Sequence, residues 1–149
     1  MDPEHKIKRE IAKRCWEGAT PYEEYYRELL EGFDEFSIAP PDGDWEAMTE
    51  TEVDECYMVM SETEFIGDYE AEFRSGDETV DLPCPHDGGH YEAKYVAREM
   101  LDGSWVAWTY YSGGGKHGYP EQIEWMYTAF NVLRREVTRV MKVTLWEEL

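Results

Sequence analysis

The sequence predicts an α+β protein in which N-terminal helices pack on a twisted antiparallel sheet of four or more strands. Helical spacing dominates the first 62 residues, and alternating apolar residues dominate the remainder. An Asp-Gly pair between two alternating runs adds a strong hairpin signal. The length of 149 residues suits a single domain, mainly helical and acidic over 1–62 and mainly antiparallel β over 63–149.

The N-terminal part predicts helices separated by turns. Thr20 resembles an N-cap, with Pro21 at the first helical position, and Gly32 ends the pattern that follows. The Pro-Pro-Asp-Gly sequence at 40–43 predicts a turn. The apolar run 56–60 fits a strand as well as a helix. We expect helices over residues 4–15, 21–31 and about 44–58.

Two hairpins are predicted where the apolar period becomes alternating. Ser75-Gly76-Asp77 separates the first pair of runs, which together span about 65–82. Asp102-Gly103 separates the second pair, Tyr91–Met100 and Ser104–Tyr111.

The C-terminal residues leave one alternative open. Residues 120–130 fit a helix that begins at Pro120, whereas residues 125–132 fit a strand. Residues 137–146 alternate more regularly, and we expect a final strand there.

The charge of the chain is large and unevenly placed. The net charge is −20, from 34 acidic and 14 basic residues. Residues 16–92 hold 24 acidic and two basic residues, whereas residues 93–149 hold seven of each. Such a field opposes compaction, repels DNA and anionic lipid, and attracts basic proteins. We expect a basic protein partner, no direct contact with nucleic acid, and no membrane contact.

One stretch concentrates this charge. Between Glu28 and Phe73 no lysine or arginine occurs, and large apolar residues are interleaved with the acids. Disordered acidic tails lack such apolar groups, so we expect a folded scaffold that holds the carboxylates on its surface. The predicted partner-binding residues are Glu28, Glu31, Asp34, Glu35, Asp42, Asp44, Glu46, Glu50, Glu52, Asp54, Glu55, Glu62, Glu64, Asp68, Glu70 and Glu72.

Several features of the sequence predict a cytoplasmic protein. No apolar run reaches the roughly 20 residues that a membrane-spanning helix needs. The first residues contain no apolar signal region. Three cysteines at wide spacing predict reduced thiols.

Cys84, His86 and His90 are the strongest candidate metal ligands. Their intervals of two and four residues suit zinc, with Cys15 or Cys56 as a fourth ligand. A thiol nucleophile at Cys84 beside His86 is a further interpretation. The chain has no Cys-x-x-Cys pair, and a polar turn between strands explains the same residues. We expect no cofactor and keep this cluster as an alternative.

Two loops resemble ligand-binding loops without matching their patterns. Residues 112–118 place glycines before Lys116, but His117 stands where a phosphate loop needs serine or threonine. These glycines predict a tight turn with positive φ angles. The acidic turn at 42–46 lacks the twelve-residue pattern of a calcium loop.

The acidic stretch has the charge and size of a short DNA duplex. Double-stranded DNA carries one charge per about 1.7 Å, so a net charge of about −22 corresponds to roughly 37 Å, or about eleven base pairs. A compact domain of this length is roughly 40 Å across. Salt adaptation would make the whole chain acidic, but residues 93–149 are neutral. This segregation favours a specific face that imitates nucleic acid.

In charge and size the chain resembles small inhibitors encoded by phages and mobile elements, including DNA-mimicking anti-restriction and anti-CRISPR proteins. The runs Asp102–Tyr111 and Gly113–Glu121 also resemble small phage proteins. The second resemblance covers about the C-terminal third and implies no activity. The first implies a role but transfers no individual residue.

These observations predict a non-enzymatic inhibitor in the cytoplasm of a host cell. Its carboxylates would mimic nucleic acid and block the basic binding site of a host defence protein, a CRISPR effector or a restriction enzyme. Two alternatives stay open. One is a metal- or thiol-dependent enzyme centred on Cys84, His86 and His90, and the other is a generic acidic protein-interaction module. A dimer is compatible with the sequence.

Overall fold

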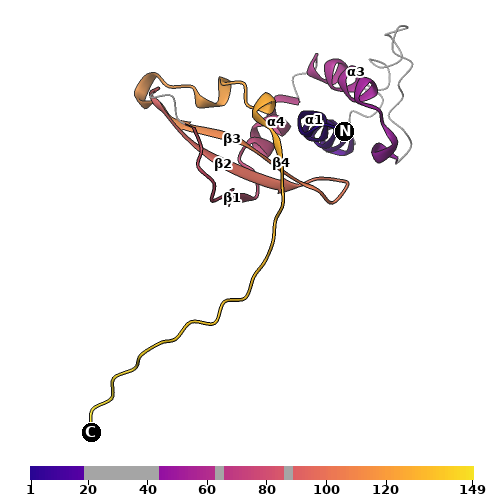
Figure 1. The fold of residues 1–149 in the computed structure, drawn as a ribbon. Coiled ribbons are helices and arrows are strands. Elements are labelled where there is room, and N and C mark those ends of the chain that lie inside the picture. Colours follow the sequence, from indigo (N-terminus) through magenta and orange to yellow (C-terminus); the bar gives the residue numbers. More distant parts are fainter. Residues whose placement is uncertain (19–43, 63–65, 86–88) are drawn as a thin grey trace.

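The computed structural model describes residues 1–18, 44–62, 66–85 and 89–149. It contains an antiparallel sheet in the order β1-β2-β3-β4, with helices packed against it (Figure 1). This arrangement confirms the predicted α+β class. The elements are α1 (Pro3–Gly18), η1 (Trp45–Ala47), α3 (Glu50–Ser61), α4 (Ile66–Arg74), β1 (Glu78–Val80), β2 (Tyr91–Glu99), β3 (Trp105–Gly113), η2 (Gly115–His117), η3 (Pro120–Gln122), η4 (Met126–Thr128) and β4 (Phe130–Val132), where η marks a short 3₁₀ helix.

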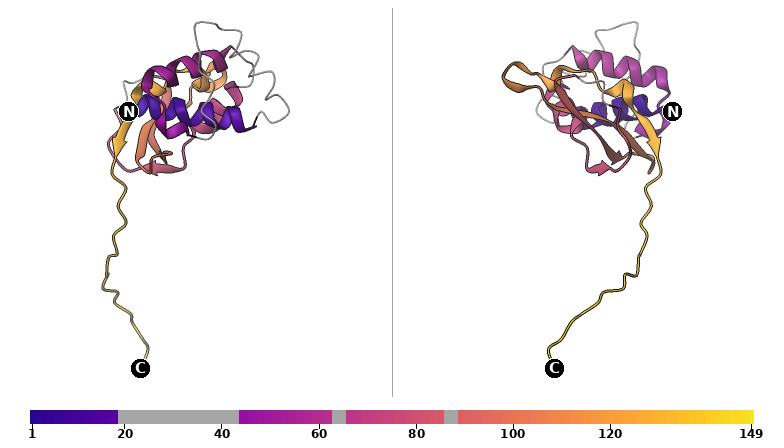
Figure 2. Two further views of the ribbon diagram at one scale, coloured as in Figure 1. Left: turned by 90° about the vertical axis from the view of Figure 1, so that its right-hand side faces the viewer. Right: turned by 60° about the vertical axis from the view of Figure 1, so that its left-hand side comes forward.

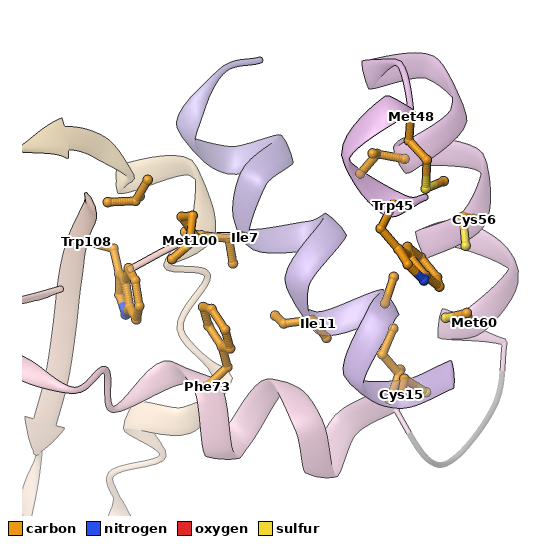
Figure 3. Packing of buried hydrophobic residues seen from close by; sticks show 14 of the residues in the cluster. Ile7, Ile11, Cys15, Trp45, Met48, Cys56, Met60, Phe73, Met100 and Trp108 are labelled. Atoms are coloured by element: carbon orange, nitrogen blue, oxygen red, sulfur yellow. The ribbon is translucent and has the colours of Figure 1, made fainter. Parts of the chain in front are cut away.

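The central helix of the molecule is α1, which confirms the helix expected within 4–15. It lies between the sheet and α3, and α4 packs beside it (Figure 3). Ile7, Ile11 and Cys15 recur every four residues and are fully buried. The Asp2 carboxylate accepts the backbone N–H of His5 at 3.0 Å and so satisfies one of the free donors at the start of the helix.

The hydrophobic core has two parts that meet at α1. On the sheet side, Phe73 of α4 stacks on Trp108 of β3, with ring centroids 5.5 Å apart. On the far side, Trp45 lies beside Cys56 and Met60, between α1 and α3 (Figure 3). Contact with both parts fixes α1 in place, because its removal would expose apolar surface on each side.

The β2–β3 hairpin forms as predicted around Asp102-Gly103. Gly103 has a φ of +80°, and the backbone N–H of Met100 donates to the Ser104 carbonyl at 2.7 Å. The Asp102 carboxylate accepts the N–H of Ser104 at 3.0 Å and its hydroxyl at 2.6 Å. This local turn chemistry sets the register of nine residue pairs between β2 and β3.

The hairpin predicted over about 65–82 is wrong. Its first half is helix α4, and only Glu78–Val80 forms a strand, which pairs with β2. Ile66 and Phe73 are buried on the same face of the helix, two turns apart, whereas Ala71 is exposed. A short run with few apolar residues satisfies a period of 2 and a period of 3.6 almost equally, which explains the error.

The helix expected over about 44–58 begins later and ends later. Residues 45–47 form η1, and α3 starts after a break at Met48 and Thr49. Thr49 and Glu52 form a capping box, in which each side chain accepts the backbone N–H of the other residue at 3.2 Å and 2.9 Å. The helix predicted over 21–31 and the turn at 40–43 lie outside the described residues.

The C-terminal predictions are only partly confirmed. Residues 120–132 contain η3, η4 and the three-residue strand β4 in place of one helix or one longer strand. The strand expected over 137–146 is wrong, because residues 133–149 form no ladder with the described part of the chain. This segment, hereafter the C-terminal tail, runs away from the body in both views of Figure 2. None of the described helices has the length and hydropathy needed to cross a bilayer.

Polar contacts of α1 tie it to the elements on both sides. His5 lies between Asp54 of α3, with Nε2 to Oδ2 at 2.9 Å, and Asp2, with Nδ1 to Oδ2 at 2.5 Å. Buried Lys6 donates to the Ser104 hydroxyl at 2.8 Å and lies 3.3 Å from the Asp102 carboxylate. The basic residues of α1 therefore hold both α3 and the β2–β3 turn.

The His5 contacts predict a specific dependence of stability on pH. Burial lowers the pKa of His5, but the hydrogen bonds to Asp54 and Asp2 outweigh burial and raise it. The imidazolium therefore stabilises the fold below the unfolded value of about 6.5, and this contribution is lost as pH rises through the folded pKa. Urea unfolding at a series of pH values is expected to show this loss in the wild type and not in His5→Gln. The control variant His117→Gln, at an exposed site, should show the same pH-dependent loss of stability as the wild type. Equal profiles for all three proteins would contradict the assignment to His5.

The Lys6 contacts predict a loss of stability on substitution. Burial raises the pKa of Asp102, but hydrogen bonds from Ser104 and Lys6 outweigh burial and lower it to about 2. We expect Lys6→Met to lower the free energy of unfolding by about 1–2 kcal/mol at pH 7, because the turn loses a charged donor. Lys116→Met, at an exposed position, serves as the control and should change it by less than about 0.5 kcal/mol. Equal effects in denaturant titrations would show that Lys6 does not hold the turn.

Candidate acidic interface

Ten of the sixteen predicted partner-binding carboxylates lie within the described residues. They are carried by η1, α3 and α4 and by the residues that flank them. Six lie outside the described part of the chain: Glu28, Glu31, Asp34, Glu35, Asp42 and Glu64. The structure divides the ten into a group with partners inside the protein and a group that faces solvent.

The first group, hereafter the inward set, consists of Glu50, Glu52, Asp54 and Glu70. Glu50 accepts the backbone N–H of Asp2 at 2.8 Å, and Asp54 contacts His5 and, at 3.5 Å, Lys8. These two side chains stand one helical turn apart on α3 and both face the start of α1. They hold two helices together, which differs from the predicted role in partner binding.

The other two members of the inward set are also structural. Glu52 completes the capping box at the start of α3. Glu70 of α4 accepts a hydrogen bond from the hydroxyl of Tyr57 of α3. Burial raises the pKa of Tyr57, and the bond to Glu70 raises it further, so the phenol stays protonated and remains a donor.

The second group, hereafter the outward set, lies on η1, α3 and α4 and on the residues beside them. None of its side chains forms an ion pair with another described residue, and each is exposed except Glu55, which is half-buried. The outward set consists of Asp44, Glu46, Glu55, Glu62, Asp68 and Glu72.

No cation within residues 44–62 and 66–85 balances the outward set. Arg74 is the single basic residue of these ranges. It is turned toward the sheet, where it donates to the Tyr111 carbonyl at 2.8 Å and lies 4.6 Å from the ring centroid of Tyr110. Within the described residues of these ranges, the exposed side chains of α3 and α4 therefore include acids and no base.

One carboxylate of the outward set occupies a position that is unfavourable for the helix. Glu62 is the C-cap residue of α3, and the last turn of this helix contains no basic residue. A negative charge at the C-terminus of a helix opposes the helix dipole, typically by about 0.3–1 kcal/mol. The local stability of α3 does not account for a glutamate here.

The predicted metal cluster is not assembled by the described residues. His86 lies outside them, His90 is exposed, and the half-buried Cys84 donates its thiol weakly to the Pro85 carbonyl at 3.9 Å. The two cysteines proposed as a fourth ligand are buried in the α1–α3 core. Burial, together with the neighbouring Cys15, raises the pKa of Cys56 to about 12, which disfavours the thiolate that metals bind.

Within the described residues, the side chains of Asp2, His5 and Glu50 bring three potential ligand atoms within 4.8 Å of one another. Both ring nitrogens of His5 already face carboxylate oxygens of Asp2 and Asp54. Ion pairing between α1 and α3 explains this cluster without a metal.

The glycine-rich loop forms the tight turn that the sequence predicts. Gly113, Gly114 and Gly115 have φ angles of +76°, +89° and +69°. A side chain at Gly114 would also collide with the ring of Tyr91, 2.5 Å from an added Cβ. The loop joins β3 to η2 rather than a strand to an α-helix, so it lacks the helix N-terminus of a phosphate loop. In the acidic turn at 42–46, the described Asp44 and Glu46 are both exposed.

Comparison of the chain with protein-family models, with curated proteins and with solved structures finds no match.

Proposed function

We propose that this protein is a non-enzymatic inhibitor whose outward set occupies the nucleic-acid-binding surface of a basic protein. One observation carries the proposal: six carboxylates stand on packed helices and their flanks, free of ion pairs with the described residues, and residues 44–62 and 66–85 hold no cation that balances them. Helices hold such charges in place, as the phosphates of a duplex are held. A flexible acidic tail would lose more entropy on binding.

The spacing of the charges supports this role. Glu55 and Glu62 are seven residues apart, which is about two turns, so they point to a similar side about 10.5 Å apart along the axis. Carboxylates of α4 and η1 add charge beside this helix. A basic groove that accepts phosphates every few ångströms offers several contacts to such a surface. The association is expected to be fast and strongly weakened by salt.

The resemblance to small phage inhibitors directs the choice of partner. Restriction enzymes and CRISPR effectors bind duplex DNA or a heteroduplex in positively charged channels. We propose a protein of this class as the target. The unfavourable placement of Glu62 supports selection of this surface for its charge rather than for stability.

The proposal predicts that neutralising four of the six carboxylates of the outward set strongly weakens competition with DNA. The test variant is Glu46→Gln/Glu62→Gln/Asp68→Asn/Glu72→Gln, and the assay measures how much labelled duplex the protein displaces from a restriction enzyme or a Cas9-type effector. We expect the concentration for half displacement to rise at least roughly 30-fold at 100 mM salt, since each lost contact weakens an ion pair at the interface.

A matched control carries the same change of net charge on the other half of the chain: Glu92→Gln/Glu99→Gln/Glu121→Gln/Glu124→Gln, all at exposed positions. The control should change the concentration for half displacement by less than about threefold, because its sites lie outside the proposed interface. Equal losses of DNA displacement in both variants would mean that the net charge of the protein, and not the position of the carboxylates, determines binding. Binding of the target without displacement of DNA would favour the generic interaction module, and the lack of any binding would overturn the proposal for that target class.

A further inference from the structure

The C-terminal tail is an exposed segment with the pattern of a half-buried strand. Val137, Met141, Val143 and Leu145 fall on one side of the alternation and are 65%, 79%, 72% and 79% exposed. Monomeric proteins rarely present so many large apolar groups in one continuous segment. The pattern indicates that this side is covered in the functional state of the protein.

The geometry of the sheet prevents the tail from being covered by its own β3. In the β3–β4 ladder, Phe130 pairs with Ala107 and Val132 pairs with Trp105. Trp105 is the first residue of β3, so after Val132 the chain has passed the end of its neighbouring strand. A continuation of β4 therefore has no backbone to pair with in the same sheet.

The described part of the chain leaves one face of the sheet without covering helices, hereafter the open face, and this face has a hollow that suits such a segment. The helices cover the face that carries Val96 and Trp108, whereas Ala97 and Trp105 lie on the other face. There, residues of both edge strands line a hollow of about 480 Å³, whose apolar lining includes Val80, Leu82, Ala97, Trp105, Phe130 and Leu133.

The root of the tail shows how its basic residues contact this face. Arg134 lines the hollow, and its Nε is 2.9 Å from Glu78 Oε2 of β1. Its guanidinium lies 5.1 Å from the ring centroid of Trp105. Arg134 therefore contacts both an acid and an aromatic ring of the open face.

Charge complementarity favours a second copy of this chain as the partner that covers the apolar side of the tail. Residues 137–146, the part of the tail with the strand pattern, contain two basic residues and no acid, whereas the hollow is lined by the acids Glu78 and Asp81. This part of the tail is thus a basic segment on an acidic protein. Its complement, a hollow that combines apolar side chains with the carboxylates of Glu78 and Asp81, is present in every copy of the chain.

We propose that the tail of one copy lies across the open sheet face of a second copy, reciprocally, in a two-fold symmetric dimer. The ten residues 137–146 extend over about 33 Å, comparable to the nine-residue strands β2 and β3. The side with Met141 and Val143 enters the hollow, and Arg139, on the same side, reaches its carboxylates. A two-fold axis lets both tails make the same contacts.

The first test is the dimer dissociation constant, measured by sedimentation equilibrium on the full chain. Met141→Asp/Val143→Asp places two charges on the inward side and is expected to weaken the dimer at least roughly tenfold. Thr138→Asp/Thr144→Asp adds the same charge on the outward side and should weaken it less than about threefold. A wild-type protein that is monomeric at about 100 µM, or equal effects of the two variants, overturns the proposal.

A second test locates the tail. In a Cys84→Ala background, one chain carries Val143→Cys and another carries Leu82→Cys, and the two are mixed under mild oxidation. A disulfide-linked heterodimer is expected, because Leu82 lines the hollow that receives Val143. Homodimers formed by the Val143→Cys chain alone would show that the tails pair with each other, which contradicts seating in the hollow. This dimer does not depend on the proposed inhibitory function, because neither test uses the target protein.

Discussion

The docking of a basic helix into an acidic protein is the interaction on which the rest of this structure depends. Helix α1 lies between the sheet and α3, and both parts of the apolar core end on it. Its polar residues reach in two directions, His5 and Lys8 toward Asp54, and Lys6 toward the turn at Asp102. A chain with a net charge of −20 repels itself, and these contacts offset part of that repulsion where the helices meet.

This arrangement separates two uses of the same residue type. Carboxylates that meet α1, cap α3 or bond Tyr57 hold the fold, and their charge is neutralised or satisfied by hydrogen bonds. The six carboxylates of the outward set have no such contacts with the described residues, and all except the half-buried Glu55 are exposed. We therefore expect substitutions in the outward set to preserve the fold and substitutions in the inward set to destabilise it.

Much of the fold follows from local sequence, and the division of the acids does not. Asp102-Gly103 sets the β2–β3 hairpin because the turn is encoded by neighbouring residues, and α1 follows from apolar residues every four positions. Thr49-x-x-Glu52 was a readable capping signal that assigns Glu52 a structural role. By contrast, His5 and Asp54 are 49 residues apart, so the role of Asp54 depends on how α1 and α3 pack. The tail shows a related limit, since an alternating pattern predicts a strand without predicting its partner.

The division of the acidic residues into an inward and an outward set is tested most directly by the free energy of unfolding of two variants that change the net charge equally. The inward variant is Glu50→Gln/Glu52→Gln/Asp54→Asn/Glu70→Gln, and the outward variant is Glu46→Gln/Glu62→Gln/Asp68→Asn/Glu72→Gln. The account predicts that the inward variant is destabilised by about 2–4 kcal/mol, because a cap, an ion pair and two hydrogen bonds are weakened. The outward variant should be as stable as the wild type or more so, because repulsion falls. Equal destabilisation of the two variants would contradict the division of the acidic residues into structural and exposed sets.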